Sequence, residues 1–372
     1  MKYILRVCFV ILYFFGFISC GWQKDANLSR VNEQDNMTSD SSEETELDNK
    51  YRQAYNQFNA DYSDQVSQVV RRIYRDSKGV LWIGSQDGIS SFDGESHTYH
   101  EILNQYNEKI TVKAITEDVD GNIWFGASGG IVQFDGVSFI QFDERDGLIS
   151  DDVWCIEFDN LGRLWIGTIN GVCYFNGKAF VPFKMPESEV DQTRGVTSPR
   201  IVHSIMKDSD GRMWFATNGG AYIYDGELLK NMSEKDGLCN NAVNSILEDD
   251  SGNIWFATHH GGVCLYDGNS FKSVTDTLNL ENNEVWSLHL DDFGNIWFPI
   301  ENSGLYQYDG NSLKNFSNDV ELPNYGSIQD IWGDKSGMLW VGGFGGLYRF
   351  NLNDSIRDNS AFINVKKVGP WM

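Results

Sequence analysis

The sequence predicts an all-β fold, a seven-bladed β-propeller made of four-stranded antiparallel blades. Three observations predict it: a repeat of about 40–45 residues, several short apolar–polar alternations within each repeat, and glycine turns between them. The clearest copies are residues 208–226 and 250–268. Seven copies, hence seven blades, are marked by anchor tryptophans spaced 42, 41, 49, 41, 42 and 43 residues apart: Trp82, Trp124, Trp165, Trp214, Trp255, Trp297 and Trp340.

Each repeat contains the pattern of four strands. Around Trp124, alternating runs predict strands over residues 112–116, 123–127, 131–134 and 139–142. In six repeats the third and fourth strands are separated by a pair that favours a two-residue hairpin turn. These pairs are Asp93-Gly94, Asp135-Gly136, Asn176-Gly177, Asp225-Gly226, Asp267-Gly268 and Asp309-Gly310.

The anchor tryptophans are expected in the core, because one buried indole removes roughly 150–250 Å² of surface from water. Two positions later, six repeats carry a small residue that would let neighbouring sheets pack closely: Gly84, Gly126, Gly167, Ala216, Ala257 and Gly342. The Asp-rich segments before the anchors, such as residues 118–122, faintly resemble calcium loops. Because they fall between two strands, we expect plain hairpin turns in which Asp bonds nearby backbone.

Closure of the ring needs a strand from outside the seventh repeat, which lacks the Asp-Gly turn after its third strand. Outer strands carry two apolar residues three positions apart. Tyr55 and Phe58 match this pattern at the usual distance before the first repeat. We therefore expect residues 54–59 to form the outer strand of the last blade. The alternative is the segment that contains Phe362 and Val365.

The N-terminal segment resembles a bacterial lipoprotein signal. In residues 1–19, basic positions precede an apolar run that ends at Cys20, which we expect to be lipidated. An ordinary secretory signal or a membrane anchor is the alternative.

We expect a disordered acidic tether over residues 20–50, the propeller over 51–350 and a C-terminal tail over 351–372.

Charge and cysteine content restrict the partners and the cross-links. The formal net charge of −24 argues against nucleic acid or a broad anionic lipid surface as partner. We expect a monomer that reaches the membrane by its lipid anchor only.

Cys155 and Cys173 are expected on two strands of one blade, with a third strand between them. Two strand spacings put the two cysteines about 10 Å apart. That distance exceeds disulfide reach, and we expect no disulfide framework.

One position in the repeat is chemically diverse where its neighbours are uniform. The residues twelve and nine positions before each anchor are always Val, Ile or Leu. The residue eleven positions before the anchor varies between repeats in charge, polarity and size. This position lies near the start of the innermost strands, at the mouth of the propeller channel. We call its members the mouth ring: Arg71, Lys113, Trp154, His203, Asn244, Trp286 and Gln329.

The composition of the mouth ring predicts a ligand site. Indole faces stack on the apolar faces of sugars, and guanidinium groups bind carboxylate or sulfate. A small-molecule or glycan ligand is therefore expected there. The alternative is that these residues only fill and solvate the channel.

Two turns between the second and third strands are one residue longer than the others. They contain His259, His260 and Glu301. These side chains could serve as acid and base or bind a metal, which makes them the candidate catalytic residues; plain solvated turns are the alternative. No cofactor and no metal is expected, because no phosphate-binding loop or nucleophile motif occurs.

The unit Asp-x-x-Gly-x-(Leu/Ile)-Trp-(Ile/Phe)-Gly-Thr resembles the two-component regulator propeller repeat, over residues 54–350. The resemblance implies a sensor-like module of the bacterial cell envelope that binds a ligand or an envelope protein without catalysis, with glycan fragments as one ligand class. Gly21 rather than Asp follows Cys20, which disfavours retention at an inner membrane, so we expect anchorage in the outer membrane. Streptogramin lyases look similar at the repeat level and are the enzymatic alternative, and a protein-docking scaffold is the third.

Overall fold

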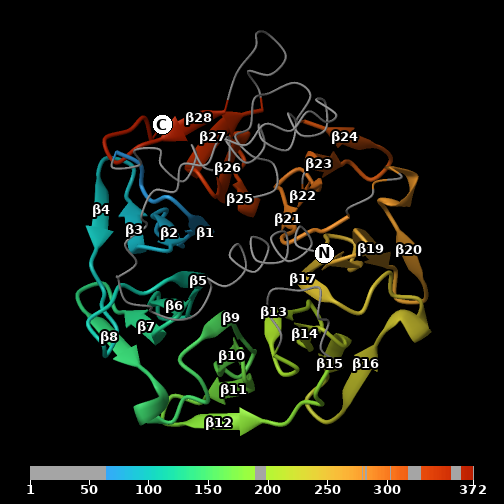
Figure 1. The fold of residues 1–372 in the computed structure, drawn as a ribbon, viewed down its shortest axis with the longest axis horizontal. Coiled ribbons are helices and arrows are strands. Elements are labelled where there is room, and N and C mark those ends of the chain that lie inside the picture. The colour runs from blue at the N-terminus through green and yellow to red at the C-terminus, as the bar shows by residue number, and fades with distance from the viewer. Residues whose placement is uncertain are drawn as a thin grey trace, which may run out of the picture. The chain divides into compact units, whose positions relative to one another are not determined.

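The predicted fold class and blade number are confirmed. The structure, a computed structural model, describes residues 64–188, 198–278, 280, 283–301, 303–316, 328–352 and 362–371. Within these ranges the strands form seven antiparallel sheets of four strands each, arranged as blades around a central axis (Figure 1). In each blade the four strands follow one another in chain order from the axis to the rim.

The strands of the first four blades are β1 (Val70–Arg75), β2 (Leu81–Ser85), β3 (Gly88–Phe92), β4 (His97–His100); β5 (Val112–Glu117), β6 (Ile123–Ala127), β7 (Gly130–Phe134), β8 (Phe139–Phe142); β9 (Val153–Phe158), β10 (Leu164–Thr168), β11 (Gly171–Phe175), β12 (Phe180–Phe183); β13 (Val202–Lys207), β14 (Met213–Thr217), β15 (Gly220–Tyr224) and β16 (Leu229–Met232).

The last three blades contain β17 (Val243–Glu248), β18 (Ile254–Thr258), β19 (Val263–Tyr266), β20 (Phe271–Ser273); β21 (His289–Leu290), β22 (Ile296–Ile300), β23 (Gly304–Tyr308), β24 (Leu313–Asn315); β25 (Ile328–Gly333), β26 (Met338–Gly343), β27 (Gly346–Asn351) and β28 (Ile363–Val365). Short 3-10 helices η1 (Glu144–Asp146), η2 (Glu234–Asp236) and η3 (Asp276–Leu278) lie between blades.

The anchor tryptophans are buried, and in six blades each is tied to the turn that precedes it. In the first blade, the Trp82 indole N–H donates to Asp76 Oδ2 at 2.8 Å, while Asp76 Oδ1 accepts backbone N–H groups from Lys78 and Val80. The same indole–carboxylate bond, at 2.7–2.9 Å, recurs for Trp124, Trp165, Trp214, Trp255 and Trp297. The Asp-rich segments are thus hairpin turns whose carboxylates bond the local backbone, as expected.

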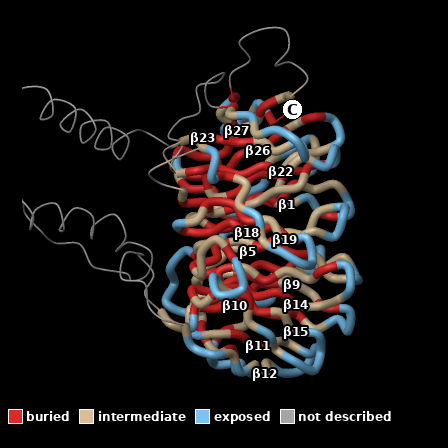
Figure 2. The backbone as a smooth tube through the Cα atoms, turned by 90° about the vertical axis from the view of Figure 1, so that its right-hand side faces the viewer, coloured by how far each residue is buried: buried red, intermediate tan, exposed pale blue. Residues whose placement is uncertain are grey.

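The hydrophobic core lies between blades rather than inside any one of them. Each of seven clusters among the described residues joins side chains from two neighbouring blades. Buried residues run along the strands, and exposed ones gather at the turns (Figure 2). The small residues after the anchors make this packing possible. A Cβ added to Gly84 would lie 2.7 Å from Val112 of the next blade, and one added to Gly342 would lie 2.6 Å from Val70.

The closing strand differs from our expectation. The outer strand of the seventh blade is β28, which pairs with β27 through Leu347↔Val365. This is the segment kept as the alternative, and it places part of residues 351–372 inside the propeller. Two packing contacts explain it: Phe362 stacks on Phe350 at 4.8 Å, and Val365 is fully buried. Residues 54–59 lie outside the described residues.

The C-terminal residues also join the seventh blade to the first. Lys366 pairs with Asp64 and bridges to Gln65. Further on, the Trp371 indole is buried and stacks on Phe92 at 4.8 Å. Both ends of the described chain therefore hold the ring closed.

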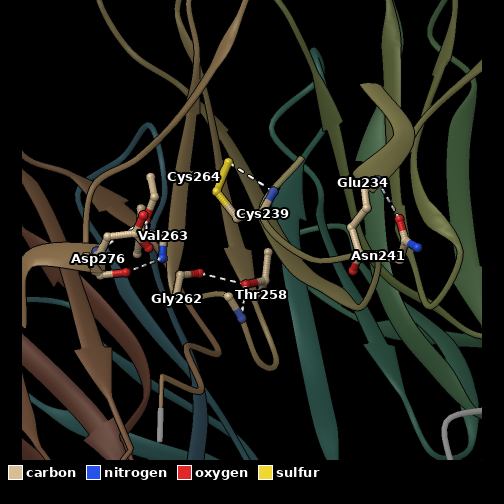
Figure 3. The surroundings of a disulfide bond; sticks show 11 residues. Glu234, Cys239, Asn241, Thr258, Gly262, Val263, Cys264 and Asp276 are labelled. Atoms are coloured by element: carbon tan, nitrogen blue, oxygen red, sulfur yellow. Dashed lines mark hydrogen bonds between the residues drawn. A yellow bond between two sulfur atoms is a disulfide. The ribbon is translucent and has the colours of Figure 1, made fainter. Parts of the chain in front are cut away.

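A disulfide corrects a second expectation. Cys239, in the loop before β17, is bonded to Cys264 on β19, with 5.8 Å between the Cα atoms (Figure 3). Strand spacing separates Cys155 from Cys173, and both are free and buried. The bonded pair joins a loop to a strand, and η2 with its left-handed cap at Gly237 brings that loop onto the blade. Spacing along strands does not reveal such a contact.

Trp371→Ala should destabilise the ring, because the indole covers Phe92 between the first and last blades. We expect a loss of up to about 3–5 kcal/mol, as for other core Trp→Ala changes. Thermal melts measure it, with Val368→Ala, at a 94% exposed position, as the matched control. Equal melting temperatures for both variants would contradict the role of the C-terminal residues in closure.

Ile149→Cys should create a second disulfide with Cys173. The loop before β9 repeats the loop before β17, with η1 and a left-handed Gly147 in the corresponding places. The backbone of Ile149 also hydrogen-bonds to Cys173, as that of Cys239 does to Cys264. Cross-linking a loop of this size should stabilise the protein by about 3 kcal/mol.

Peptide mapping under non-reducing conditions detects the new disulfide. Ile140→Cys, at a 44% exposed position on β8, is the control that should keep a free thiol. A free Cys173 in the oxidised Ile149→Cys variant would show that the two loops are not equivalent.

Candidate functional site

Six of the seven mouth-ring residues stand at an irregularity of the innermost strand. In β1 the pairing with β2 shifts between Val70 and Arg72, so that Arg71 is the extra residue of a β-bulge. Equivalent shifts occur at Lys113, Trp154, His203, Asn244 and Gln329. A bulge leaves its extra residue outside the ladder and re-aims the side chain. Trp286 precedes the short β21, where no such pairing is formed.

Mouth-ring side chains contact one another from blade to blade. Arg71 Nη1 donates to Gln329 Oε1 at 3.4 Å, across the seam between the first and last blades. The Lys113 ammonium lies 4.3 Å from the centre of the Trp154 ring. On its other side, Trp154 packs edge-on against His203 at 5.6 Å. These contacts cross three blade boundaries: between the seventh and first blades, the second and third, and the third and fourth.

The remaining members join the ring through backbone and turn residues. The Asn244 amide donates to the carbonyl of Val285, directly before Trp286, at 2.8 Å. His203 Nε2 is 3.0 Å from Asn218 Oδ1 in the turn after β14. Trp286 packs against His259 at 6.3 Å. Turns and innermost strands therefore meet at one end of the propeller.

Asp152 organises the cationic part of the ring. It forms an ion pair with Lys113 and accepts the indole N–H of Trp154 at 3.2 Å. Burial lowers the pKa values of Lys113 and Arg71 from their ordinary values, and the Asp152 carboxylate opposes both shifts. Arg71 Nε is buried and has no hydrogen-bond partner among the described residues. Arg71 therefore retains a buried N–H that a bound acceptor could use.

A second group of titratable side chains lies beside Trp286. His259 Nδ1 is 2.6 Å from Glu284 Oε1, and the His259 ring packs edge-on against His260 at 4.2 Å. The backbone N–H of Glu301 donates to the Glu284 carbonyl at 2.9 Å. Burial, followed by a hydrogen bond and charge repulsion from Glu284, raises the pKa of Glu301 to about 8. The raised pKa favours the protonated form of Glu301, which can donate a hydrogen bond.

The predicted catalytic candidates are thus close to one another, with Glu284 as an additional member. Such a group can hold or transfer a proton. Among the described residues, no cluster of His, Cys, Asp or Glu has the arrangement of a metal site.

Sequence reasoning missed Asp152 and Glu284, which pair with Lys113 and His259. Both stand thirteen residues before an anchor tryptophan, one position before the mouth ring's uniform Val neighbour. Most repeats carry an apolar or small residue there, so the two carboxylates were a visible signal. Cys20, the expected lipidation site, lies outside the described residues. None of the described helices has the length and apolar character needed to span a membrane.

The family model of the two-component regulator propeller matches four segments of the chain: residues 64–87, 147–170, 195–219 and 237–260. No curated protein sequence gives a significant match. The matched segments each run through the end of one repeat's loop, its first strand and its anchor hairpin.

Solved structures share the fold. The extracellular domain of BT3049 from B. thetaiotaomicron, described as a hybrid two-component system, is 25% identical with a TM-score of 0.64, over 81% of this chain and 41% of that one. This chain therefore spans about two fifths of that relative. A virginiamycin B lyase from Staphylococcus aureus is 13% identical (TM-score 0.60, 76% and 95% covered). PorZ, a surface component of the type-IX secretion system of Porphyromonas gingivalis, is 16% identical (TM-score 0.57, 75% and 46% covered).

The last two similarities, both below 25% identity, show the fold alone. The chain is thus a seven-bladed propeller in which four segments match the two-component regulator propeller model, and its fold is similar to that of the BT3049 extracellular domain.

Proposed function

We propose that this chain is a lipid-anchored propeller of the bacterial cell envelope that binds a ligand at its mouth ring without catalysing a reaction. The observation that carries the proposal is the coincidence of two features at one position. The residue that varies most between repeats is also the residue that a bulge releases from the sheet in six blades. Bulges of this kind commonly lie beside binding sites.

The ligand chemistry follows from the side chains at that position. Trp154 and Trp286 offer indole faces on two different blades, and both side chains are only half-buried. Lys113 is already paired with Asp152, which leaves Arg71 as the cation with an unused buried N–H. A glycan fragment with a carboxylate or sulfate would match both features. An envelope protein that presents the same groups is the other partner class.

The cellular setting of the proposal rests on two supports. The BT3049 domain, which has a similar fold, is extracellular. The N-terminal segment ends its apolar run at Cys20, as lipoprotein signals do. We therefore place the propeller outside the cytoplasm, anchored in the outer membrane by a lipid on Cys20.

Trp154→Ala and Trp286→Ala should each weaken binding of a ligand found by screening a glycan and envelope-protein panel. Stacking on one aromatic side chain is worth about 1–3 kcal/mol in nucleic-acid complexes, and we expect no more for a sugar. Titration calorimetry measures the loss. Arg71→Ala should matter only for anionic ligands, with an effect that shrinks as salt is added.

The control is Trp255→Ala, which removes an anchor and should instead lower stability by about 3–5 kcal/mol. If the Trp154 and Trp286 variants bind as the parent does, the mouth ring only fills the channel. For a variant that loses binding, circular dichroism should show that the protein is still folded, so that the loss reports the missing contact and not unfolding.

Cys20→Ser should abolish lipidation but leave the propeller folded, because Cys20 precedes the described blades by more than 40 residues. Metabolic labelling with a fatty-acid analogue reports the lipid, and a thermal melt of the same variant reports the fold. Label that persists in the Ser variant would refute the anchor.

A second candidate function is acid–base catalysis by His259, His260 and Glu301. It is favoured by the proton that Glu301 retains and by the neighbouring His259–Glu284 pair. A lyase-like enzyme would lose turnover but keep binding in His260→Ala or Glu301→Gln. A binding module would show no turnover in any variant.

Glu301→Gln should remove a pH-dependent loss of stability. The unfolded carboxyl loses its proton near pH 4.5, whereas the folded one keeps it until about pH 8. The folded state therefore binds more protons in this window, and stability falls as the pH rises through it. Denaturant melts from pH 4 to 9 measure the free energy of unfolding of both proteins. The value for the variant should rise relative to that of the parent up to about pH 8, and the difference should be constant above that pH.

Glu227→Gln, in an exposed turn, is the control. Its free energy of unfolding should change with pH as that of the parent does. A constant difference between parent and Glu301→Gln at every pH would mean that Glu301 ionises normally in the folded protein.

A further inference from the structure

A pocket of about 180 Å³ lies at the seam between the first and seventh blades, at the other end of β1 from the mouth ring. We call it the seam pocket. An engineered apolar cavity of about 150 Å³ holds one benzene molecule, so the seam pocket has room for a single six-membered ring. The residues that matter for its chemistry are Arg75, Phe92, Trp332, Asp334, Trp340 and Trp371.

The seventh blade departs from the other six where this pocket opens. Elsewhere the anchor indole donates to the Asp six residues before it. In the seventh blade, Asp334 Oδ1 accepts the backbone N–H groups of Ser336 and Met338, and Oδ2 lies 3.5 Å from Arg75 Nη1. Among the described residues, no hydrogen bond joins Trp340 to Asp334. The Trp340 indole, which lines the pocket, therefore lacks the carboxylate acceptor that the other six anchors have.

Three indoles surround the space. Trp371 stacks on Phe92 at 4.8 Å and on His97 at 4.7 Å. Phe92 and His97 are cross-strand partners in β3 and β4, so their side chains lie side by side and cover the same face of Trp371. The Trp340 ring centre is 6.4 Å from that of Trp371, and the two rings are tilted by 33°. Trp332 is half-buried on the seventh-blade side.

The polar groups stand at the rim. The Arg75 side chain is 47% exposed and lies 5.8 Å above the Trp332 ring, and the Asp334 side chain is 20% exposed. An exposed ion pair with a 3.5 Å contact contributes little to stability and is easily separated. The Arg75 guanidinium, the Asp334 carboxylate and the Trp340 indole N–H are therefore the polar groups beside the aromatic rings of the seam pocket.

We propose that the seam pocket binds one pyranose ring of a glycan. The apolar face of the sugar would stack on indole, while Arg75 and Asp334 would take adjacent hydroxyl groups and Trp340 would donate to a third oxygen. An aromatic side chain of a peptide fits the volume but would leave these polar groups unused. The site is independent of the mouth ring, because it shares no residue with it.

Saturation-transfer NMR with the whole chain tests the proposal. The probes are the methyl glycosides of glucose, galactose, mannose, N-acetylglucosamine and glucuronic acid, with indole as the aromatic probe. At least one glycoside should bind, and Trp332→Leu and Arg75→Met should each weaken it by about tenfold or more, as expected for one lost stacking or charged contact. Both replaced residues lie at the rim, so circular dichroism should show both variants folded.

Trp154→Ala separates this site from the mouth ring. The seam-pocket glycoside should bind the Trp154→Ala variant as it binds the parent, whatever becomes of the function proposed above. Binding that is lost in Trp154→Ala but kept in Trp332→Leu would overturn the seam pocket as a sugar site. So would a failure of every glycoside to bind, including the case in which indole alone binds and the pocket takes an aromatic side chain.

Discussion

The hydrogen bond from the anchor indole to the Asp of the preceding turn is the contact on which six of the seven blades depend. One carboxylate accepts turn amides through Oδ1 and the indole through Oδ2, so it fixes the hairpin and the core side chain together. Burial alone would raise the pKa of Asp118, but the bonds from Trp124 and Asn122 hold it below its usual value. The carboxylate therefore stays charged, and hydrogen bonds to a charged group are among the stronger ones in proteins.

Once the indole is fixed, the rest of the blade has little freedom. Two residues later the chain must pass within van der Waals distance of the next blade, which is why Gly126 would meet Val153 at 2.8 Å if it carried a Cβ. Nine and twelve residues before the anchor, apolar side chains complete the core between blades. The bulge position between them is outside the ladder. It can vary without disturbing the core, and chemistry can therefore differ there from blade to blade.

The sequence was sufficient for the fold because the same constraints act seven times. At the mouth ring, comparison between repeats separates the variable position from the packed ones, and the structure has a bulge at that position in six blades. Asp152 and Glu284 were missed because they occupy a position that most repeats fill with apolar or small residues. The closing strand and the Cys239–Cys264 bond were mispredicted for another reason. Two segments fitted the strand pattern, and a loop that folds back onto a blade has no periodic signal.

The two cations of the mouth ring differ in how well they are paired. Lys113 is buried but paired with Asp152, and such a pair roughly offsets its own desolvation. Arg71 lacks this compensation at Nε, and a buried N–H without a partner costs about 1–3 kcal/mol. The chain has a net charge of −24 and is rich in carboxylates. If Arg71 only filled the channel, one more carboxylate could have accepted this N–H. The unused N–H of Arg71 at the bulge therefore supports the proposed site for an external anion.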